Sequence, residues 1–220
     1  AGINYQNFDV DRTPGRIIES LYNSNNRIFN NQHFFNVEAG YNYANADNPT
    51  FATIGMEFDT KFGYTSNLDE KRSFAYNITS LAITHKLIPS GKVVLATKGK
   101  AHFNFGNDFE FYQAANIGGT NGLRGYRNQR FSGKRSFYQN TDLRYSFNKI
   151  KTPLLPIKIG VYGSFDYGRV WTSNLDYSEK WHNSFGGGLF VSGVDLISCN
   201  IGAFHSNDGM RIAFALGFGF

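Results

Sequence analysis

Residues 210–220 read Met-Arg-Ile-Ala-Phe-Ala-Leu-Gly-Phe-Gly-Phe and alternate between large apolar side chains and small or basic ones. A period of two residues predicts a β-strand, because successive side chains point to opposite faces of a sheet. The large apolar residues on one face are Ile212, Phe214, Leu216, Phe218 and Phe220. Large side chains on one face and very small ones on the other suit a strand that lies between lipid and a crowded barrel lumen.

The same alternation recurs from end to end, and no stretch has a convincing helical period. We expect about eleven strands, near 2–9, 15–23, 33–44, 50–64, 72–88, 92–106, 135–148, 155–171, 184–192, 195–205 and 210–220. Several are longer than the roughly five or six residues usual in soluble sheets, whereas a tilted strand needs about nine to eleven residues to cross a bilayer. The prediction is an all-β protein, a transmembrane antiparallel β-barrel.

The connections between the predicted strands alternate in length. Short, turn-like connections fall at 11–15, 44–49, 89–91, 149–153 and 192–194, and longer ones at 24–32, 65–71, 107–134 and 172–183, with 205–209 as a weak last member. Outer-membrane barrels show this pattern, with tight turns at the periplasmic rim and larger loops outside. A soluble β-sandwich would explain any single strand equally well, but it gives no reason for loops sorted in this way.

Composition excludes several classes of protein. The net charge is +5 with a pI near 9.2, but the basic residues are scattered without a clustered stripe, so we expect no nucleic-acid partner. The single cysteine, Cys199, permits neither a disulfide framework nor a cysteine-based metal site. No apolar run approaches the ~20 residues of a membrane helix, and no signal peptide opens the chain.

The longest connection, 107–134, contains the glycine-rich run Gly118-Gly-Thr-Asn-Gly-Leu-Arg-Gly-Tyr126. A loop of this length is either functional or disordered, and its many aromatic residues argue against disorder. Its glycines allow tight turns that project Arg124, whose guanidinium favours a carboxylate partner. Asp166 and Asp142 lie on the polar, lumen-facing sides of the next strands, which predicts an ionic latch inside the barrel. The alternative is an ordinary hairpin loop with a surface arginine.

These residues resemble a known family, the BamA, TamA and FhaC superfamily of outer-membrane assembly and secretion barrels, also called the bacterial surface antigen family. The resemblance rests on Leu123-Arg124-Gly125-Tyr126, on Phe165-Asp166-Tyr167-Gly168 and on the terminal strand that ends in Phe220. It implies an inward-folded loop at 107–134, with Leu123, Arg124, Gly125 and Tyr126 as the latch motif. Its implied partners in the lumen are Asp166, Asp142, Phe165 and Gly168.

The resemblance also implies a barrel of about sixteen strands, five of them after the loop. Residues 1–220 would then be the C-terminal part of one barrel domain, and its first strands and any periplasmic or enzymatic domain would lie outside this chain. Phe214, Leu216, Phe218 and Phe220 would form one side of the barrel seam and the terminal signal for insertion.

Catalytic chemistry is not expected. The five histidines are dispersed without metal-ligand spacing, and the chain has neither a nucleophile-elbow motif nor a phosphate loop. We expect no enzyme activity, cofactor or metal. The predicted function is assembly or translocation of polypeptides at the Gram-negative outer membrane, with outer-membrane lipid, client polypeptides and accessory subunits as partners. The alternative is the membrane anchor of an outer-membrane phosphoesterase or patatin-like lipase. A passive porin is disfavoured by the latched loop.

Overall fold

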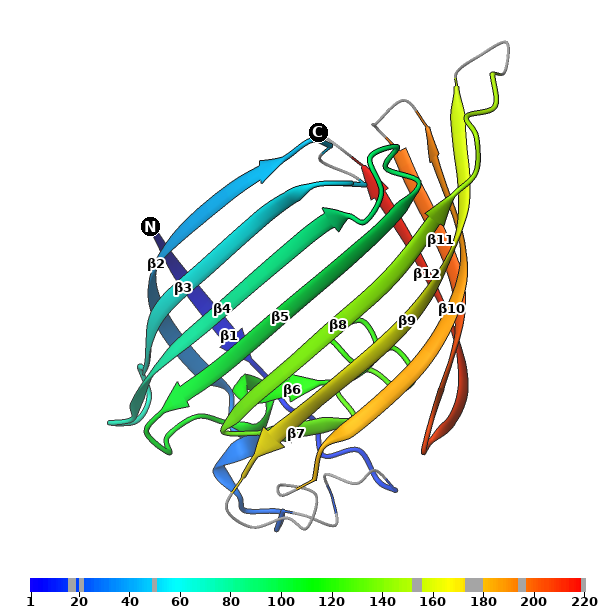
Figure 1. Cartoon of the computed structure of the whole chain (residues 1–220). Coiled ribbons are helices and arrows are strands. Elements are labelled where there is room, and N and C mark those ends of the chain that lie inside the picture. Colours follow the sequence, from blue (N-terminus) through cyan, green and yellow to red (C-terminus); the bar gives the residue numbers. More distant parts are fainter. Residues whose placement is uncertain are drawn as a thin grey trace.

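The computed structural model describes residues 1–15, 19, 22–48, 51–151, 156–172, 180–193 and 197–218. Ten strands form one antiparallel sheet in which each strand pairs with its neighbours in chain order (Figure 1). These strands are β1 (Gly2–Phe8), β2 (Gln32–Ala46), β3 (Gly55–Asn67), β4 (Ser73–Lys86), β5 (Val93–Phe105), β8 (Arg135–Ser146), β9 (Ile157–Trp171), β10 (His182–Gly193), β11 (Ile197–Ser206) and β12 (Gly209–Phe218). The all-β, antiparallel prediction is confirmed.

The sheet is strongly curved but open (Figure 1), with β1 and β12 as its two edges. The expected eleven strands become ten in this sheet, and a sixteen-stranded barrel stays a prediction. The difference arises near 15–23, where most residues lie outside the described part of the chain and the described residues 15, 19, 22 and 23 are not in a strand. Among the described residues, five strands follow the long loop, as expected.

The two faces of the sheet differ in the way that the alternation predicts. On β9, Val161 and Phe165 are exposed on the outer, convex face, whereas Tyr162 and Asp166, which follow them directly in the sequence, are buried on the inner, concave face. Large exposed apolar side chains also alternate along β10, β11 and β12. Cys199 follows the buried Ser198 in β11 and therefore lies on the outer side of the strand. No described helix has the length and apolar content needed to cross a membrane.

The sorting of loops by length is only partly correct. At the lower end of Figure 1 the chain passes from β1 to β2, from β3 to β4, from β5 to β8, from β9 to β10 and from β11 to β12, and at the opposite end it passes from β2 to β3, from β4 to β5, from β8 to β9 and from β10 to β11. The connections 68–72 and 207–208 are as short as those of the other rim. Strand pairing continues to Ser66–Ser73 and to Ser206–Gly209, so the ladders include residues that the sequence pattern assigns to loops.

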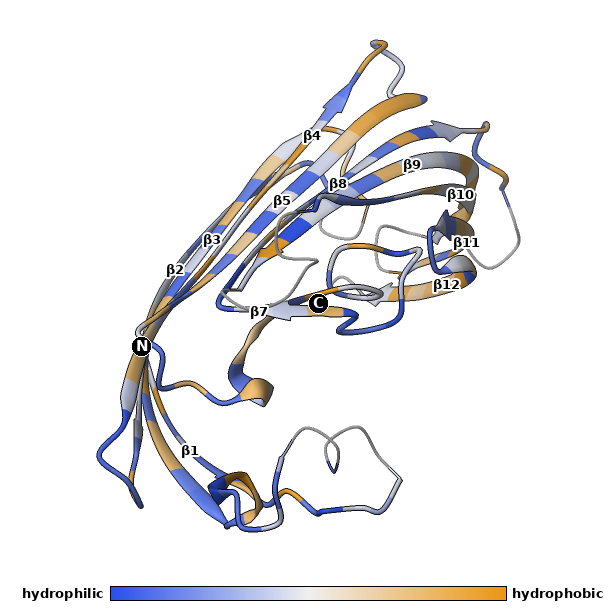
Figure 2. Ribbon diagram, turned by 90° about the horizontal axis from the view of Figure 1, so that it is seen from below, coloured by the Kyte–Doolittle hydropathy of each residue, from blue (hydrophilic) through white to orange (hydrophobic). Residues whose placement is uncertain are grey.

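The connection 106–134, hereafter the inner loop, folds into the curve of the sheet (Figure 2). It contains a short 3-10 helix, η2 (Phe111–Gln113), and the two short strands β6 (Ala115–Ile117) and β7 (Phe131–Gly133), which pair with each other. Its apolar side chains form a buried cluster with one residue each of β8 and β9, which belong to the wall, as we call the large curved sheet. The cluster comprises Ile117, Leu123, Tyr126, Phe131, Tyr138 and Val170. Burial of this apolar surface holds the inner loop against β8 and β9.

Candidate functional site

Arg124 of the inner loop binds Asp166 of β9 through several groups at once. Its Nη2 lies 2.5 Å from Oδ1 and its Nε 3.1 Å from Oδ2, and its backbone N–H donates to Oδ2 at 3.1 Å. Asn140 Nδ2 and Ser184 Oγ donate further hydrogen bonds to the carboxylate, at 2.7 Å and 3.1 Å. Asp166 is completely buried, and this set of donors compensates for the loss of water around its charge.

Asp142 on β8 holds the other side of the same guanidinium. Arg124 Nη2 donates to its Oδ1 at 2.8 Å, and Ser164 Oγ donates to the same oxygen at 2.7 Å. Arg144 Nη2 lies 3.5 Å from Oδ2. Burial lowers the pKa of Arg124, but the bonds and charges of the two aspartates outweigh burial and raise that pKa overall. Arg124 therefore remains a cation that joins two adjacent strands, an arrangement we call the loop latch.

Gly125 lets the backbone of the inner loop sit directly on the wall. A Cβ at this position would lie 2.7 Å from Cβ of Ser184 and 3.1 Å from the carbonyl oxygen of His205, so a side chain has no room. The Gly125 N–H donates to Ser184 Oγ at 3.2 Å, and its carbonyl accepts from Ser206 Oγ at 2.8 Å. On either side of the Arg124-Gly125 pair, Leu123 and Tyr126 are buried in the apolar cluster.

Gly168 and Phe165 are also expected from the sequence as partners of the loop in the lumen, and the structure places them on opposite faces of β9. Gly168 faces the inner loop, where a Cβ would meet Ile117 Cδ1 at 3.1 Å, so the absence of a side chain admits Ile117. Phe165 is not a partner in the lumen, and the expectation is corrected here. Its side chain is 48% exposed on the outer face, because it precedes Asp166 in a strand and must point the opposite way.

The last strand presents its apolar side chains outward. Phe214 and Leu216 are 64% and 52% exposed on the outer face. Phe218 belongs to β12, but its side chain lies outside the described residues, as does the whole of Phe220. Within the described residues β12 pairs only with β11, so its other edge is open. The seam and insertion-signal roles stay predictions.

Three polar residues that complete the loop latch were not expected from the sequence, namely Asn140, Ser164 and Ser184. A signal for two of them was available. Asn140 and Ser164 each lie two residues before an aspartate on a predicted strand, and therefore on the same face as that aspartate. Ser184 becomes a partner only through the pairing register Ser184–Asp166, which the sequence pattern does not specify.

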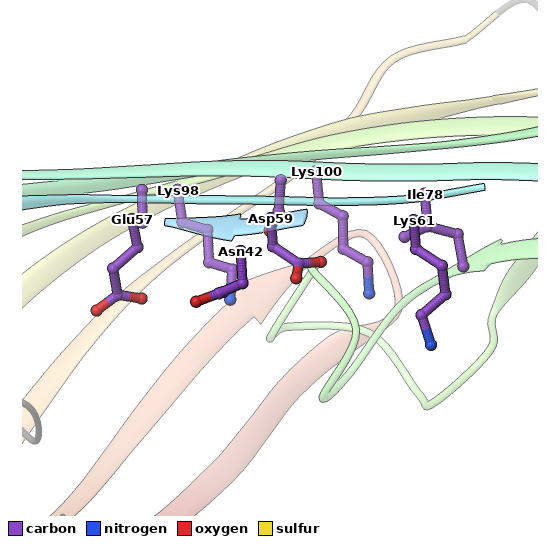
Figure 3. Close-up of a pocket in the computed structure, with 9 residues that line it drawn as sticks. Asn42, Glu57, Asp59, Lys61, Ile78, Lys98 and Lys100 are labelled. Atoms are coloured by element: carbon purple, nitrogen blue, oxygen red, sulfur yellow. The ribbon is translucent and has the colours of Figure 1, made fainter. Parts of the chain in front are cut away.

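The inner wall of β3–β5 carries a second group of charges (Figure 3). A pocket of about 430 Å³ is lined there by Glu57, Asp59, Lys61, Lys98 and Lys100, among others, and it shares no lining residue with the loop latch. Acidic and basic side chains alternate along this wall, which suits a water-filled lumen better than a site for one ion. Among the described residues, no group of three or more histidine, cysteine or acidic side chains could hold a metal ion.

Comparison with known proteins places this geometry in a family. Among curated proteins, none matches the sequence. The crystal structure of BamA from Haemophilus ducreyi lacking POTRA domains 1–3 is similar in fold, with a TM-score of 0.61, 17% identity, and coverage of 84% of this chain and 42% of that chain. This chain thus spans less than half of that protein's length. At this level of identity the similarity concerns the fold alone. The Omp85 superfamily domain matches residues 1–219, and the chain therefore belongs to the Omp85 superfamily of outer-membrane β-barrel proteins, as its sequence motifs indicate.

Proposed function

We propose that this chain forms the C-terminal part of an integral outer-membrane barrel that inserts polypeptides into the membrane or moves them across it, and that this activity requires the inner loop in its latched position. The observation that carries the proposal is the bridge from Arg124 to both Asp142 and Asp166. A buried ion pair adds little net stability, yet removal of one partner leaves an unpaired charge at a cost of about 3–5 kcal/mol. The latch therefore favours one loop position over all others.

Two features of the sheet support the choice of partners. The outer face exposes large apolar side chains along successive strands, as a lipid-facing surface requires. The edges β1 and β12 each have a single partner strand among the described residues, so both present unpaired backbone donors and acceptors. Open edges accept an added strand by main-chain hydrogen bonding, and such a strand could come from a client polypeptide or from the rest of the barrel. Accessory subunits would act on the same barrel.

A charge exchange across the latch tests the proposal. In the full-length protein in its outer membrane, Arg124→Asp and Asp166→Arg are each expected to reduce client assembly or secretion strongly, and the double exchange to restore part of it. Coupling between contacting residues appears as non-additivity in such a cycle. If the two losses simply add, the latch does not support function and the proposal is wrong.

The same loop offers a matched control pair. Arg130 Nε lies 2.6 Å from Asp208 Oδ2 in a more exposed setting, with side chains 40% and 26% exposed. Exposed ion pairs contribute about 0–1 kcal/mol, so Arg130→Asp should leave client assembly close to that of the unmodified protein. The amount of the barrel itself in the membrane must be measured for every variant, so that lost activity is separated from lost insertion.

A further inference from the structure

The first part of the inner loop contacts a different region of the sheet from the part that carries Arg124. Glu110 precedes the short helix η2, and its Oε1 accepts a hydrogen bond from Nη1 of Arg72 at 2.7 Å. Arg72 ends the connection between β3 and β4. The side chains of Arg72 and Glu110 are only 12% and 10% exposed. This pair is therefore largely shielded from water, unlike the ion pair of Arg130 at the other end of the loop.

The backbone around Glu110 is fixed by a second set of hydrogen bonds. The Glu110 N–H donates to Oε1 of Gln113 at 2.9 Å, which closes the turn of η2 on itself. The carbonyl of Gln113 accepts from Nδ2 of Asn104 at 3.0 Å, and Asn104 is fully buried on the inner face of β5. The carboxylate of Glu110 is thus held toward Arg72 by a turn that is itself bonded to the wall.

Tyr112 extends these contacts to the edge strand. Its ring stacks on Phe8 of β1, with 4.3 Å between the ring centroids, and it meets Phe34 of β2 edge-on. Its hydroxyl donates to Oε1 of Gln32 at 3.4 Å. Aromatic pairs of this kind contribute about 0.5–1.5 kcal/mol beyond the area they bury. The first part of the inner loop is therefore bound to β1, β2 and the β3–β4 connection.

We propose that Glu110 and Arg72, together with Tyr112, form a second anchor that positions the inner loop independently of the loop latch. The two anchors share no residue and lie on different parts of the sheet, β1–β4 and β8–β11. Each anchor restrains its own half of the loop, because a long connection tied at one point keeps most of its conformational freedom. The inference rests on the proposed function in one respect, namely that the position of the loop matters for client handling.

Limited proteolysis of the folded full-length protein in detergent measures the accessibility of the two halves of the inner loop separately. Chymotrypsin can cut at Phe111, which is half-exposed beside Glu110, and trypsin at the exposed Arg127 beyond the latch. We expect Glu110→Gln to accelerate cleavage after Phe111 on the order of tenfold or more, because Nη1 of Arg72 loses its shielded carboxylate partner and the guanidinium keeps only Glu70, which lies outside the inner loop. Cleavage after Arg127 should stay within about twofold, a change too small to report loss of a buried pair. Arg124→Ala should give the reverse pattern.

A matched control uses the same substitution on the same wall. Glu38 of β2 pairs with Lys61 Nζ at 3.0 Å but does not contact the inner loop, so Glu38→Gln should change neither cleavage. If Glu110→Gln does not fold, Arg72→Gln breaks the same pair and leaves the loop sequence intact. Unchanged cleavage at Phe111, or equal acceleration at both sites, would overturn the second anchor.

Client assembly measured on the same variants separates this inference from the proposed function. If Glu110→Gln frees only the first half of the loop and assembly also falls, both stand. If the first half is freed while assembly is unchanged for Glu110→Gln and for Arg124→Ala alike, the second anchor stands and the proposed function fails. If assembly falls while cleavage at Phe111 is unchanged, Glu110 does not position the loop and the anchor is overturned.

Discussion

Asp142 and Asp166 accept hydrogen bonds from the same nitrogen of Arg124, but only Asp166 is completely buried. Asp142 keeps 17% of its side chain exposed and has Arg144 as a second cationic neighbour. The two carboxylates are therefore unequal, since one depends on Arg124 and the other has an alternative partner and some water.

This inequality predicts different costs for the same substitution. Asp166→Asn should lower the free energy of unfolding by about 3–5 kcal/mol, because it leaves Arg124 without its main partner. Asp142→Asn should cost on the order of 1 kcal/mol, the range of a partly solvated pair. Urea titration of both variants in the same detergent would measure the difference. Equal losses would show that the two carboxylates share the guanidinium evenly.

The close approach of Gly125 to the wall predicts that even one methyl group displaces the loop. Gly125→Ala places a carbon 2.7 Å from Cβ of Ser184. Overpacking of this kind typically costs about 1–3 kcal/mol, and we expect faster tryptic cleavage at Arg127 as the loop latch loosens. Ser184→Gly removes the nearest obstacle and should restore part of the protection when compared with Ser184→Gly alone, which by itself removes a donor to Asp166. No recovery in the double variant would place the limiting contact elsewhere, at Ser206 or His205.

The bidentate geometry of the loop latch predicts that a positive charge at position 124 is not sufficient for client assembly. Arg124 donates through both Nε and Nη2 to Asp166 while Nη2 also reaches Asp142. In Arg124→Lys a single ammonium group replaces this planar set of donors and cannot reproduce it. Client assembly by this variant should lie closer to that of Arg124→Ala than to that of the unmodified protein. Activity equal to that of the unmodified protein would reduce the latch to a simple charge interaction.

The two rims of the sheet predict opposite accessibility in intact cells. Leu68, which is 58% exposed, lies on the rim of the inner loop, and the exposed Ser90 lies on the other rim. With Cys199 replaced by serine, a cysteine at Leu68 should react with a membrane-impermeant reagent from outside, and one at Ser90 only after the outer membrane is opened. The opposite pattern would invert the orientation.

The segment 47–54 predicts a long-range coupling to the loop latch. Phe51 stacks on Phe190 of β10 at 4.3 Å, and the guanidinium of Arg144 lies 4.5 Å from the centre of the Phe51 ring. Arg144 also lies near Oδ2 of Asp142, whereas Arg124 binds Oδ1, so Phe51 is linked through Arg144 to the carboxylate that Arg124 holds. The losses of stability in Phe51→Ala and Arg124→Ala should therefore be non-additive by about 0.5 kcal/mol or more. Strict additivity in urea titration would show that the two contacts are independent.

The strands were predictable because their signal is local. Strand β5 is expected at 92–106 and found at Val93–Phe105. An alternation that persists over so many residues is explained only by a strand with one apolar face. The short strands β6 and β7 carry no such signal, because three residues are too few to show a period. Their pairing depends on the inner loop being folded against the wall, which is a tertiary effect.

The loop latch was partly predictable for a chemical reason. An arginine among glycines, followed by aspartates on polar strand faces, restricts the partners to a few residues. The second anchor gave no such signal, because Arg72 and Glu110 are separated by two strands and neither lies in a recognisable motif. Their contact follows from the direction in which the loop crosses the lumen, and that direction is set by packing of the whole cluster around Leu123 and Tyr126.

Attachment of the inner loop to both parts of the sheet has a mechanical consequence. The inner loop crosses the concave side of the curved sheet and is attached to a different group of strands at each end. The length of chain between Glu110 and Arg124 then limits how far the β1–β4 and β8–β12 parts can spread. With both proposed anchors in place, a shorter connection would draw the two parts of the sheet together and a longer one would let them move apart, so the curvature of the sheet would depend on the length of the inner loop.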